Sequence, residues 1–332
     1  MSLVGLRGID ADRLGATCTR HLGEPVSIEG LRRLTGGASR ETWSFDARTT
    51  TGERHALVLR RDPGSNVGQA DRSTEFRLLQ AAAAAGVPVP IVRFMLDDAD
   101  DLGDGFVMDR IDGETIPRRI LRDEQYAPAR AGLTAACGSI AAQIHAVDPA
   151  TLPALAVQGP AEQIEQYRTM LDTLGEPHPA FELGLRWLED HLPETGPELP
   201  PGLVHGDFRN GNFIVGPEGI RAVLDWELSH LGDPVEDLGW LCVKSWRFGN
   251  VDQVAGGFGS TDELLVAYVA AGGAPVTVEH LQYWETFGTL KWGVICEMQC
   301  FAHLQGLVRS VELAALGRRI AETEWDLLEL IA

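Results

Sequence analysis

The chain has 332 residues, enough for two domains of about 150 residues, and its 44% apolar and 23% charged residues exclude disordered and fibrous classes. Its 48 acidic and 28 basic residues give a net charge of −20, which repels nucleic-acid phosphates and anionic membrane surfaces. No segment is long and apolar enough to cross a bilayer, and the N-terminus does not resemble a secretory signal. We therefore expect a cytoplasmic protein without a nucleic-acid or membrane partner.

Residues 1–110 carry the pattern of a small antiparallel sheet with one main helix. A helix is predicted at 10–22, and strands follow at 26–34, 41–46, 54–60, 91–96 and 105–111. Between the third and fourth strands, residues 73–85 are predicted to form a helix, with Glu75 in its first turn. Gly36 and Gly37 mark the turn between the first two strands.

From residue 111 to residue 332 the pattern is mostly helical. Helices are predicted at 129–147, 161–174, 180–191, 260–272, 278–307 and 310–331. Ser260 and Glu263 form a capping box at the start of one of them. The sequence thus predicts an α+β protein with an N-lobe at 1–110 and a larger, helical C-lobe at 111–332.

The five cysteines are scattered and odd in number, so we expect reduced thiols instead of a disulfide framework. Cys296, Cys300 and His303 recur at helical spacing and could ligate a metal ion. The apolar residues around them favour the alternative, one buried face of a long helix.

Polar side chains gather at one end of a predicted hairpin, whose strands at 213–215 and 221–224 are joined by the turn 216–219. Asp207 and Asn212 precede the first strand, and Asp225 ends the second. Antiparallel pairing brings all three to the same end, where two carboxylates and an amide oxygen suit Mg²⁺. The alternative is that these are ordinary turn residues.

The motif HGDFRNGN at 205–212, with LDWE at 224–227, resembles the aminoglycoside phosphotransferase and choline kinase superfamily. The resemblance extends to a glycine-rich loop (TGGAS, 35–39), a third strand (VLR, 58–60), the helix glutamate Glu75 and a hinge (FVMDR, 106–110). GDPVEDL at 232–238 and ELAALGRR at 312–319 resemble the branch that includes the kinase-like domain fused to some acyl-CoA dehydrogenases.

This resemblance implies a bilobal, protein-kinase-like fold that transfers the γ-phosphoryl group of ATP to a hydroxyl of a small molecule. Asp207 would orient the acceptor hydroxyl and accept its proton, and Arg209 would neutralise the transferring group. Asn212 and Asp225 would hold Mg²⁺. His205 would pack the catalytic loop, and Asp237 would accept hydrogen bonds from its backbone.

The resemblance also assigns nucleotide contacts to the N-lobe: Gly36, Gly37 and Ser39 toward the phosphates, and Met108 and Arg110 in the hinge. No lysine precedes Lys244, so Arg60 takes the place of the usual phosphate-binding lysine and pairs with Glu75. Strand alternation turns the neighbouring Arg61 to the opposite, outward face.

Only eight residues separate Asp225 from Pro234, too few for a long activation loop, so a protein substrate is disfavoured. Glu227 could contact a second Mg²⁺ or a cationic substrate. Five tryptophans of the C-lobe could line an acceptor pocket, with core packing as the alternative: Trp226, Trp240, Trp246, Trp284 and Trp292. The acceptor stays open between an aminoglycoside, a hydroxyacyl thioester, a sugar and an amino alcohol. The main alternative is a regulatory pseudokinase. A hydrolase is disfavoured, because the sequence contains no Gly-x-Ser-x-Gly motif to carry a nucleophilic serine.

Overall fold

The computed structural model describes residues 9–34, 41–62, 72–193 and 201–332. The chain forms two compact units. The N-terminal unit comprises residues 1–84 and 89–112, and the C-terminal unit comprises residues 85–88 and 113–332. Within the described residues, no helix is long and apolar enough to span a membrane.

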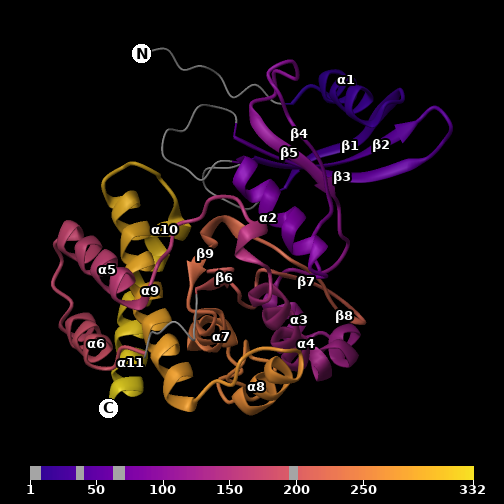
Figure 1. Cartoon of the computed structure of the whole chain (residues 1–332). Coiled ribbons are helices and arrows are strands. Elements are labelled where there is room, and N and C mark those ends of the chain that lie inside the picture. Colours follow the sequence, from indigo (N-terminus) through magenta and orange to yellow (C-terminus); the bar gives the residue numbers. More distant parts are fainter. Residues whose placement is uncertain (1–8, 35–40, 63–71, 194–200) are drawn as a thin grey trace. The chain divides into compact units, whose positions relative to one another are not determined.

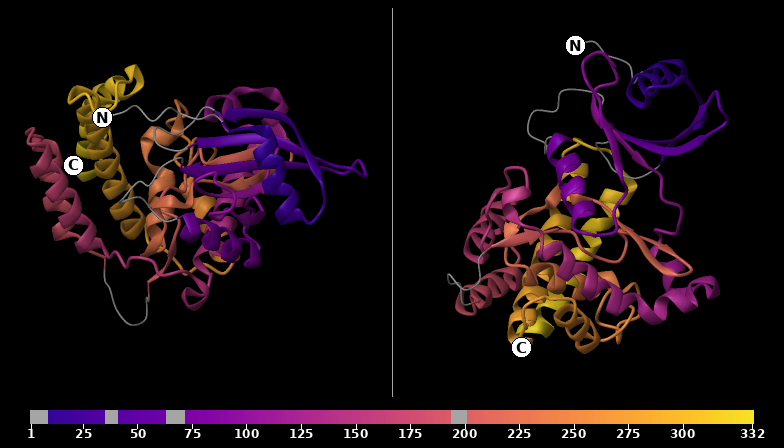
Figure 2. Two further views of the ribbon diagram at one scale, coloured as in Figure 1. Left: turned by 90° about the horizontal axis from the view of Figure 1, so that it is seen from above. Right: turned by 45° about the vertical axis from the view of Figure 1, so that its right-hand side comes forward.

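The N-terminal unit is a five-stranded antiparallel sheet with two helices (Figures 1 and 2), which confirms the predicted α+β class. The strand order is β1-β2-β3-β5-β4. The elements are α1 (Ala11–Leu22), β1 (Val26–Leu34), β2 (Glu41–Thr49), β3 (Arg54–Asp62), α2 (Arg72–Ala84), β4 (Val92–Met95) and β5 (Asp104–Asp109).

Strand β3 divides its side chains between the two faces of this sheet. Leu57 and Leu59 are buried in a core that also contains Leu14 and Cys18 of α1. Arg60 points to the other face, where it pairs with Glu75 of α2. The two helices therefore cover opposite faces, and α1 begins at Asp10, whose carboxylate caps the amide of Asp12.

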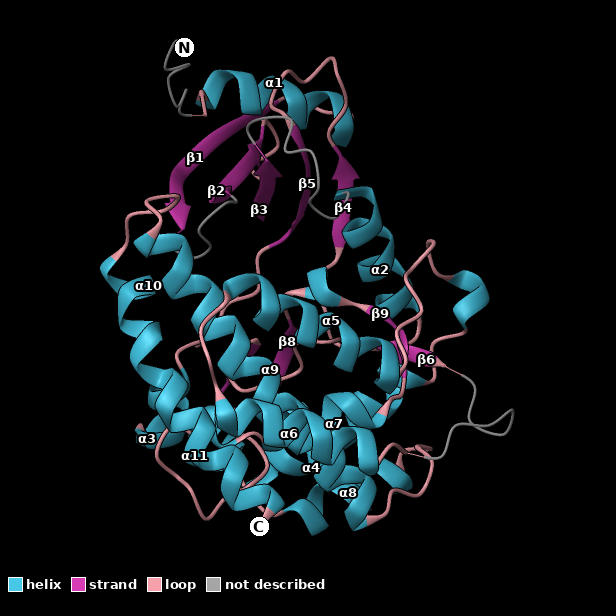
Figure 3. Ribbon diagram, turned by 90° about the vertical axis from the view of Figure 1, so that its left-hand side faces the viewer, coloured by secondary structure: helices cyan, strands magenta, loops and turns pink. Residues whose placement is uncertain are grey.

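The C-terminal unit is mainly helical, with α9 packed against α5, α6, α7, α10 and α11 (Figure 3). Two short antiparallel pairs, β6 with β9 and β7 with β8, complete it. Its helices are α3 (Pro117–Arg122), α4 (Ala127–His145), α5 (Pro160–Leu174), α6 (Pro179–Asp190), α7 (Val235–Cys242), α8 (Thr261–Ala270), α9 (Val278–Leu304), α10 (Val311–Leu316) and α11 (Ile320–Ile331). Its strands are β6 (Gly202–Val204), β7 (Phe213–Gly216), β8 (Gly219–Val223) and β9 (His230–Gly232).

The single helix predicted at 310–331 is wrong, because the structure divides it into α10 and α11 with a 3-10 turn, Gly317–Arg319, between them. A Cβ at Gly317 would lie against the sulfur and Cβ of Cys300, so only glycine allows this close approach to α9. Glycine also weakens a helix at this point. The sequence pattern predicts neither α3 nor the pairing of β6 with β9.

Candidate active site

The β7–β8 hairpin places Asn212 and Asp225 at the same end. Phe213 pairs with Val223, and the amide of Leu224 donates to the carbonyl of Asn212 at 2.8 Å. Asp225 follows at once, in the left-handed region with φ 70°, and begins the 3-10 turn Trp226–Leu228. The predicted convergence of these two residues is therefore present.

Asn212 connects the hairpin to the preceding loop. Its Nδ2 donates to Oδ2 of Asp207 at 2.5 Å and to the backbone carbonyl of Asp207 at 2.9 Å. This arrangement fixes the amide group and turns its oxygen away from the Asp207 carboxylate. Asp207 and Asn212 are therefore directly hydrogen-bonded to each other within the loop.

The second carboxylate oxygen of Asp207 accepts two more hydrogen bonds. Arg209 donates through Nε and Trp240 through its indole Nε1, each at 2.8 Å. The Asp207 side chain still has 14% of its surface exposed. The carboxylate is therefore held in one orientation and remains accessible to a small molecule.

A cluster of three tryptophans lies behind this carboxylate: Trp240 contacts Trp246 and Trp246 contacts Trp292, with neighbouring rings tilted by 60° and 57°. The guanidinium of Arg209 lies 4.3 Å from the centre of the Trp246 ring. Trp240 and Trp246 are buried, so packing is their main role, but Trp240 also orients Asp207. No sequence pattern predicts this contact.

His205 is a buried structural residue of the loop. Its Nδ1 accepts from the amide of Asp207 at 3.1 Å, and its Nε2 donates to the carbonyl of Leu224 at 3.0 Å. Burial lowers the pKa of His205, so the ring is neutral. Both ring nitrogens are engaged with backbone groups, which supports the expected packing role and disfavours proton transfer.

Asp237, from the first turn of α7, holds the backbone of the same loop, as predicted. Its two oxygens accept from the amides of His205 at 2.8 Å and Gly206 at 2.9 Å. One of them also accepts from Nε2 of His145 at 3.1 Å. Burial opposes ionisation of Asp237, but these hydrogen bonds and nearby charges outweigh it and lower its pKa.

Lys291 of α9 is a further loop contact that the sequence analysis did not identify. Its ammonium donates to the carbonyl of Gly206 at 3.1 Å and to Glu236 at 3.3 Å, and it lies over the ring of Trp240. Burial opposes its charge, yet Glu236 outweighs that effect and raises the pKa of Lys291 to about 12. The only sequence signal was the rarity of lysine in this chain.

In the N-terminal unit, Arg60 and Glu75 are in contact at 2.9 Å, and both are largely buried. Glu75 also binds Arg72, which forms a bidentate pair with Asp62 at 2.9 and 3.0 Å. The pairing expected of Arg60 is therefore present, and the structure adds Arg72, which the sequence analysis missed. A role for Arg60 in binding phosphate stays a prediction.

Arg61 lies on the opposite face of β3, but the expectation that it points outward is wrong. The residue is buried and bonds to Glu41 through Nε and Nη2, and to the carbonyl of Leu102. Glu41 balances its charge inside the unit, which allows a guanidinium to be buried there.

The remaining predicted nucleotide contacts have different surroundings. Met108 is buried in β5, between Val58 and Val92 of the neighbouring strands. The guanidinium of Arg110 binds Asp46 and Ser44 of β2, so this side chain is already used within the sheet. Gly36, Gly37 and Ser39 lie outside the described residues. Glu227 is exposed.

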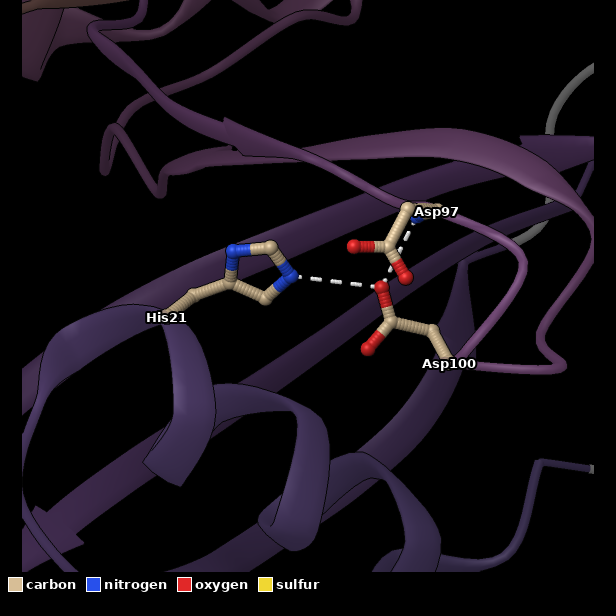
Figure 4. Close-up of side chains that lie close together, drawn as sticks. All are labelled: His21, Asp97 and Asp100. Atoms are coloured by element: carbon tan, nitrogen blue, oxygen red, sulfur yellow. Dashed lines mark hydrogen bonds and ion pairs between the residues drawn. The ribbon is translucent and has the colours of Figure 1, made fainter.

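A second acidic cluster, His21, Asp97 and Asp100, has the geometry of a cation site (Figure 4). Arg20 already supplies a cation there, because its guanidinium contacts both carboxylates at 2.5 to 2.8 Å. Burial opposes ionisation of Asp100, but its hydrogen bonds, with Arg20 first among them, lower its pKa to about 2. The cluster is therefore an internal ion pair.

The metal-ligand interpretation of Cys296, Cys300 and His303 has no support from their surroundings. Burial raises the pKa of Cys296 to about 12, and Nδ1 of His303 accepts from the amide of Ser310. All five cysteines are free thiols in the structure. Cys296 lies on the buried face of α9 that the alternative interpretation predicts, whereas Cys300 and His303 are only half-buried.

A model of the phosphotransferase enzyme family matches residues 30–276. Acyl-CoA dehydrogenase family member 10 of Mus musculus is 29% identical over 298 residues, which cover 81% of this chain and 27% of the relative. Member 11 of Gallus gallus is 28% identical, with 92% and 41% covered. The chain thus spans about a quarter to two fifths of the length of these relatives.

Solved structures share the fold. A Ralstonia eutropha protein of the aminoglycoside phosphotransferase type superposes with a TM-score of 0.76 and 24% identity, over 97% of this chain and 98% of its own. A choline/ethanolamine kinase family protein from Mesorhizobium loti has a TM-score of 0.62 and 23% identity, with 91% of each chain covered. Spectinomycin phosphotransferase, in complex with ADP and spectinomycin, has a TM-score of 0.68 and 14% identity, over 97% and 100%. These comparisons confirm the predicted resemblance.

Proposed function

The chain belongs to the phosphotransferase enzyme family, and we propose that it transfers the γ-phosphoryl group of ATP to a hydroxyl group of a small molecule. The observation that carries this proposal is the environment of Asp207. Three donors, Arg209, Asn212 and Trp240, fix its carboxylate while part of it stays exposed.

Asp207 is the base of the proposed reaction. Its carboxylate accepts a hydrogen bond from the acceptor hydroxyl, orients the attacking oxygen and accepts its proton as the phosphoryl group transfers. Arg209 lies beside it, with its guanidinium steadied on Trp246, and supplies positive charge where the transition state is anionic. Because the side chains of Asp207 and Arg209 are already held in place, they lose little conformational freedom when the reaction occurs.

The donor set at the hairpin end fits Mg²⁺. Asn212 gives its N–H to Asp207, which leaves its amide oxygen as the ligand atom, and Asp225 contributes a carboxylate. Hard oxygen ligands of this kind suit Mg²⁺, which usually keeps several waters and binds substrate phosphates. When bound, Mg²⁺ would neutralise part of the negative charge of the phosphates.

Support for ATP as the donor comes from a structural neighbour and from the N-terminal unit. Spectinomycin phosphotransferase, which shares the fold, binds ADP. In the N-terminal unit, Arg60 pairs with Glu75 and presents a planar, doubly donating cation suited to phosphate oxygens. We propose that the phosphates are approached by Gly36, Gly37 and Ser39. The hinge backbone around Met108 and Arg110 is proposed to contact the adenine ring.

A small-molecule acceptor is favoured by the segment after Asp225. Residues 226–234 form a 3-10 turn and strand β9 and lead directly into α7, so no long loop is available to bind a peptide. Aminoglycosides, hydroxyacyl thioesters, sugars and amino alcohols remain the acceptor classes to be tested.

The test is a mass-spectrometric screen for the gain of one phosphoryl group when the protein, ATP and Mg²⁺ are incubated with pools of these four classes. We expect transfer to one class, and its loss in Asp207→Asn by about two to four orders of magnitude. Asp172→Asn, an exposed carboxylate of α5, is the matched control and should be fully active. Unchanged turnover in Asp207→Asn would contradict the mechanism.

Arg60 stands where the family usually has a lysine. This replacement supports a second candidate function, that of a pseudokinase that binds nucleotide without turnover. Calorimetric titration with ATP separates the two. Binding of ATP without transfer to any pool favours the pseudokinase, whereas binding with transfer favours the kinase.

A further inference from the structure

The C-terminal unit contains a pocket of about 480 Å³ that the proposed reaction does not use. It lies among the ends of α4, α7, α8 and α9, and its volume is in the range of small-molecule sites. Most of its lining is apolar, including Ala142, Ala146, Val157, Pro160, Pro234 and Val276. Such a lining with a few polar groups at one edge is typical of a ligand site.

The polar edge of this pocket is connected to the catalytic loop by hydrogen bonds. The Tyr268 hydroxyl lies 2.9 Å from Nδ1 of His145, and Nε2 of His145 lies 3.1 Å from Oδ2 of Asp237. That carboxylate accepts from the amides of His205 and Gly206. A chain of three side chains thus runs from the pocket wall to the backbone beside Asp207.

The hydrogen bonds of Tyr268 and His145 determine which polar group of a ligand can bind at this edge of the pocket. A carboxylate only accepts, so Nε2 of His145 donates to Asp237. The Tyr268 hydroxyl and Nδ1 of His145 share the second hydrogen bond, and whichever group donates, the Tyr268 oxygen keeps a free lone pair. The oxygen of Tyr268 is left to accept a hydrogen bond, and a donor group on a ligand matches it.

Charge excludes an anionic ligand. Among the described residues, those that line the pocket include no lysine or arginine. Asp233 is part of the wall, and its carboxylate is already bonded to His280, Trp284 and the amide of Val235. Asp237 lies directly behind His145. An anion would meet two carboxylates without a compensating lysine or arginine on the wall.

We propose that this pocket is a second ligand site for a small, uncharged, mostly apolar molecule that carries a hydroxyl or amide donor, and that its occupancy is transmitted through Tyr268, His145 and Asp237 to the catalytic loop. The inference stands independently of the proposed function, because neither nucleotide nor phosphoryl transfer enters its test.

The binding test uses 4-phenyl-1-butanol, titrated by calorimetry into the full chain without nucleotide. We expect saturable binding, and two- to tenfold weaker binding of its methyl ether, which lacks the donor, the range of one hydrogen bond. Tyr268→Phe should bind the alcohol and the ether alike. Absence of saturable alcohol binding, or equal affinity of wild type for the two compounds, would overturn the proposal.

Location is tested by filling the pocket from its exposed edge. Ala146 is exposed at the C-terminal cap of α4, so Ala146→Phe blocks the pocket without disturbing the core. Ala131→Phe, at an exposed position of the same helix outside the pocket, is the matched control. We expect at least a tenfold loss of alcohol affinity in Ala146→Phe only. Equal affinity in the two variants would place the ligand elsewhere.

Transmission to the loop can be measured at one atom. His205 and Gly206 form the only His-Gly pair in the chain. Carbonyl ¹³C-histidine with ¹⁵N-glycine labelling therefore gives a single NMR signal, from the amide that donates to Asp237. We expect this signal to move when 4-phenyl-1-butanol saturates the wild type and to stay fixed when it saturates Tyr268→Phe. A fixed signal in the saturated wild type would refute the transmission.

Discussion

Trp240 donates its indole N–H to Oδ1 of Asp207 at 2.8 Å, across 33 positions of the sequence. Trp240 lies on α7 three residues after Asp237, so the two side chains share one face of the helix. Asp237 holds the loop backbone, and Trp240 holds the loop carboxylate. The helix α7 therefore positions both the backbone of the loop and the carboxylate of Asp207, the proposed base.

The first prediction concerns this contact. Trp240→Phe keeps an aromatic ring but removes the donor to Asp207. Hydrogen bonds to charged groups contribute about 1.5 to 3 kcal/mol, so we expect kcat to fall by about ten- to a hundredfold. The KM for ATP should change little, because Trp240 acts through Asp207 and not on the nucleotide. Steady-state kinetics with the accepted substrate measures both values.

Trp292→Phe is the matched control for this variant. Trp292 lies in α9 and packs against Trp246 at the other end of the cluster, with the two rings tilted. Its substitution tests whether disturbance of the tryptophan cluster alone lowers kcat. Equal losses in the two variants would show that packing, and not the hydrogen bond to Asp207, is responsible.

The second prediction concerns Arg60. Arg60→Ala should weaken ATP binding by about 1 to 3 kcal/mol, the range of a charge-assisted hydrogen bond. The unit should stay folded, because Arg72 still pairs with Glu75. Arg60→Lys keeps the charge and should retain more affinity than Arg60→Ala. Calorimetric titration with MgATP gives the three dissociation constants.

Arg61→Ala separates stability from affinity. It removes the buried partner of Glu41, which should lower the free energy of unfolding by about 3 kcal/mol. The ATP affinity of the folded protein should be unchanged. If Arg61→Ala abolishes binding and Arg60→Ala does not, the phosphate contact belongs to the other face of β3.

The third prediction concerns Mg²⁺. ATP should bind far more weakly in EDTA than with Mg²⁺, because Asn212 and Asp225 provide oxygen ligands and not positive charge. Asp225→Asn should remove most of this difference. Asp97→Asn, in the cluster that Arg20 already neutralises, should keep it. Equal calorimetric affinities with EDTA and with Mg²⁺ in the wild type would remove the metal assignment.

Local patterns account for the features that the sequence predicted well. The alternation and turn residues around β1 and the β7–β8 hairpin specify those elements, and the hairpin brings Asn212 and Asp225 together. The capping residue Ser260 accepts from the amide of Glu263, as the capping box predicts. In each case the information lies within a few residues of the feature.

The missed features depend on residues that are far apart in the chain. Lys291 contacts Gly206 across 85 positions, and Trp240 contacts Asp207 across 33. Strands β6 and β9 have three residues each, too short for a detectable alternation. At Gly317, where the helix gives way to a 3-10 turn, the backbone approaches Cys300 of α9 too closely for a Cβ. No window of sequence contains these contacts, so tertiary packing decides them.

The last prediction concerns pH and His230. Its Nε2 faces Glu236 at 3.1 Å and its Nδ1 faces the carbonyl of Leu228 at 3.0 Å, so both nitrogens must donate and the ring is protonated. Burial opposes this charge, but Glu236 outweighs burial, and also the nearby Lys291, and raises the pKa of His230 above 6.5. A raised folded pKa stabilises the protein fully below pH 6.5, and this contribution is lost as pH rises through the folded value. Urea unfolding from pH 5.5 to 9 should therefore show that the stability lost in His230→Gln is largest at low pH and shrinks toward high pH; a loss that grows with pH would contradict the assignment.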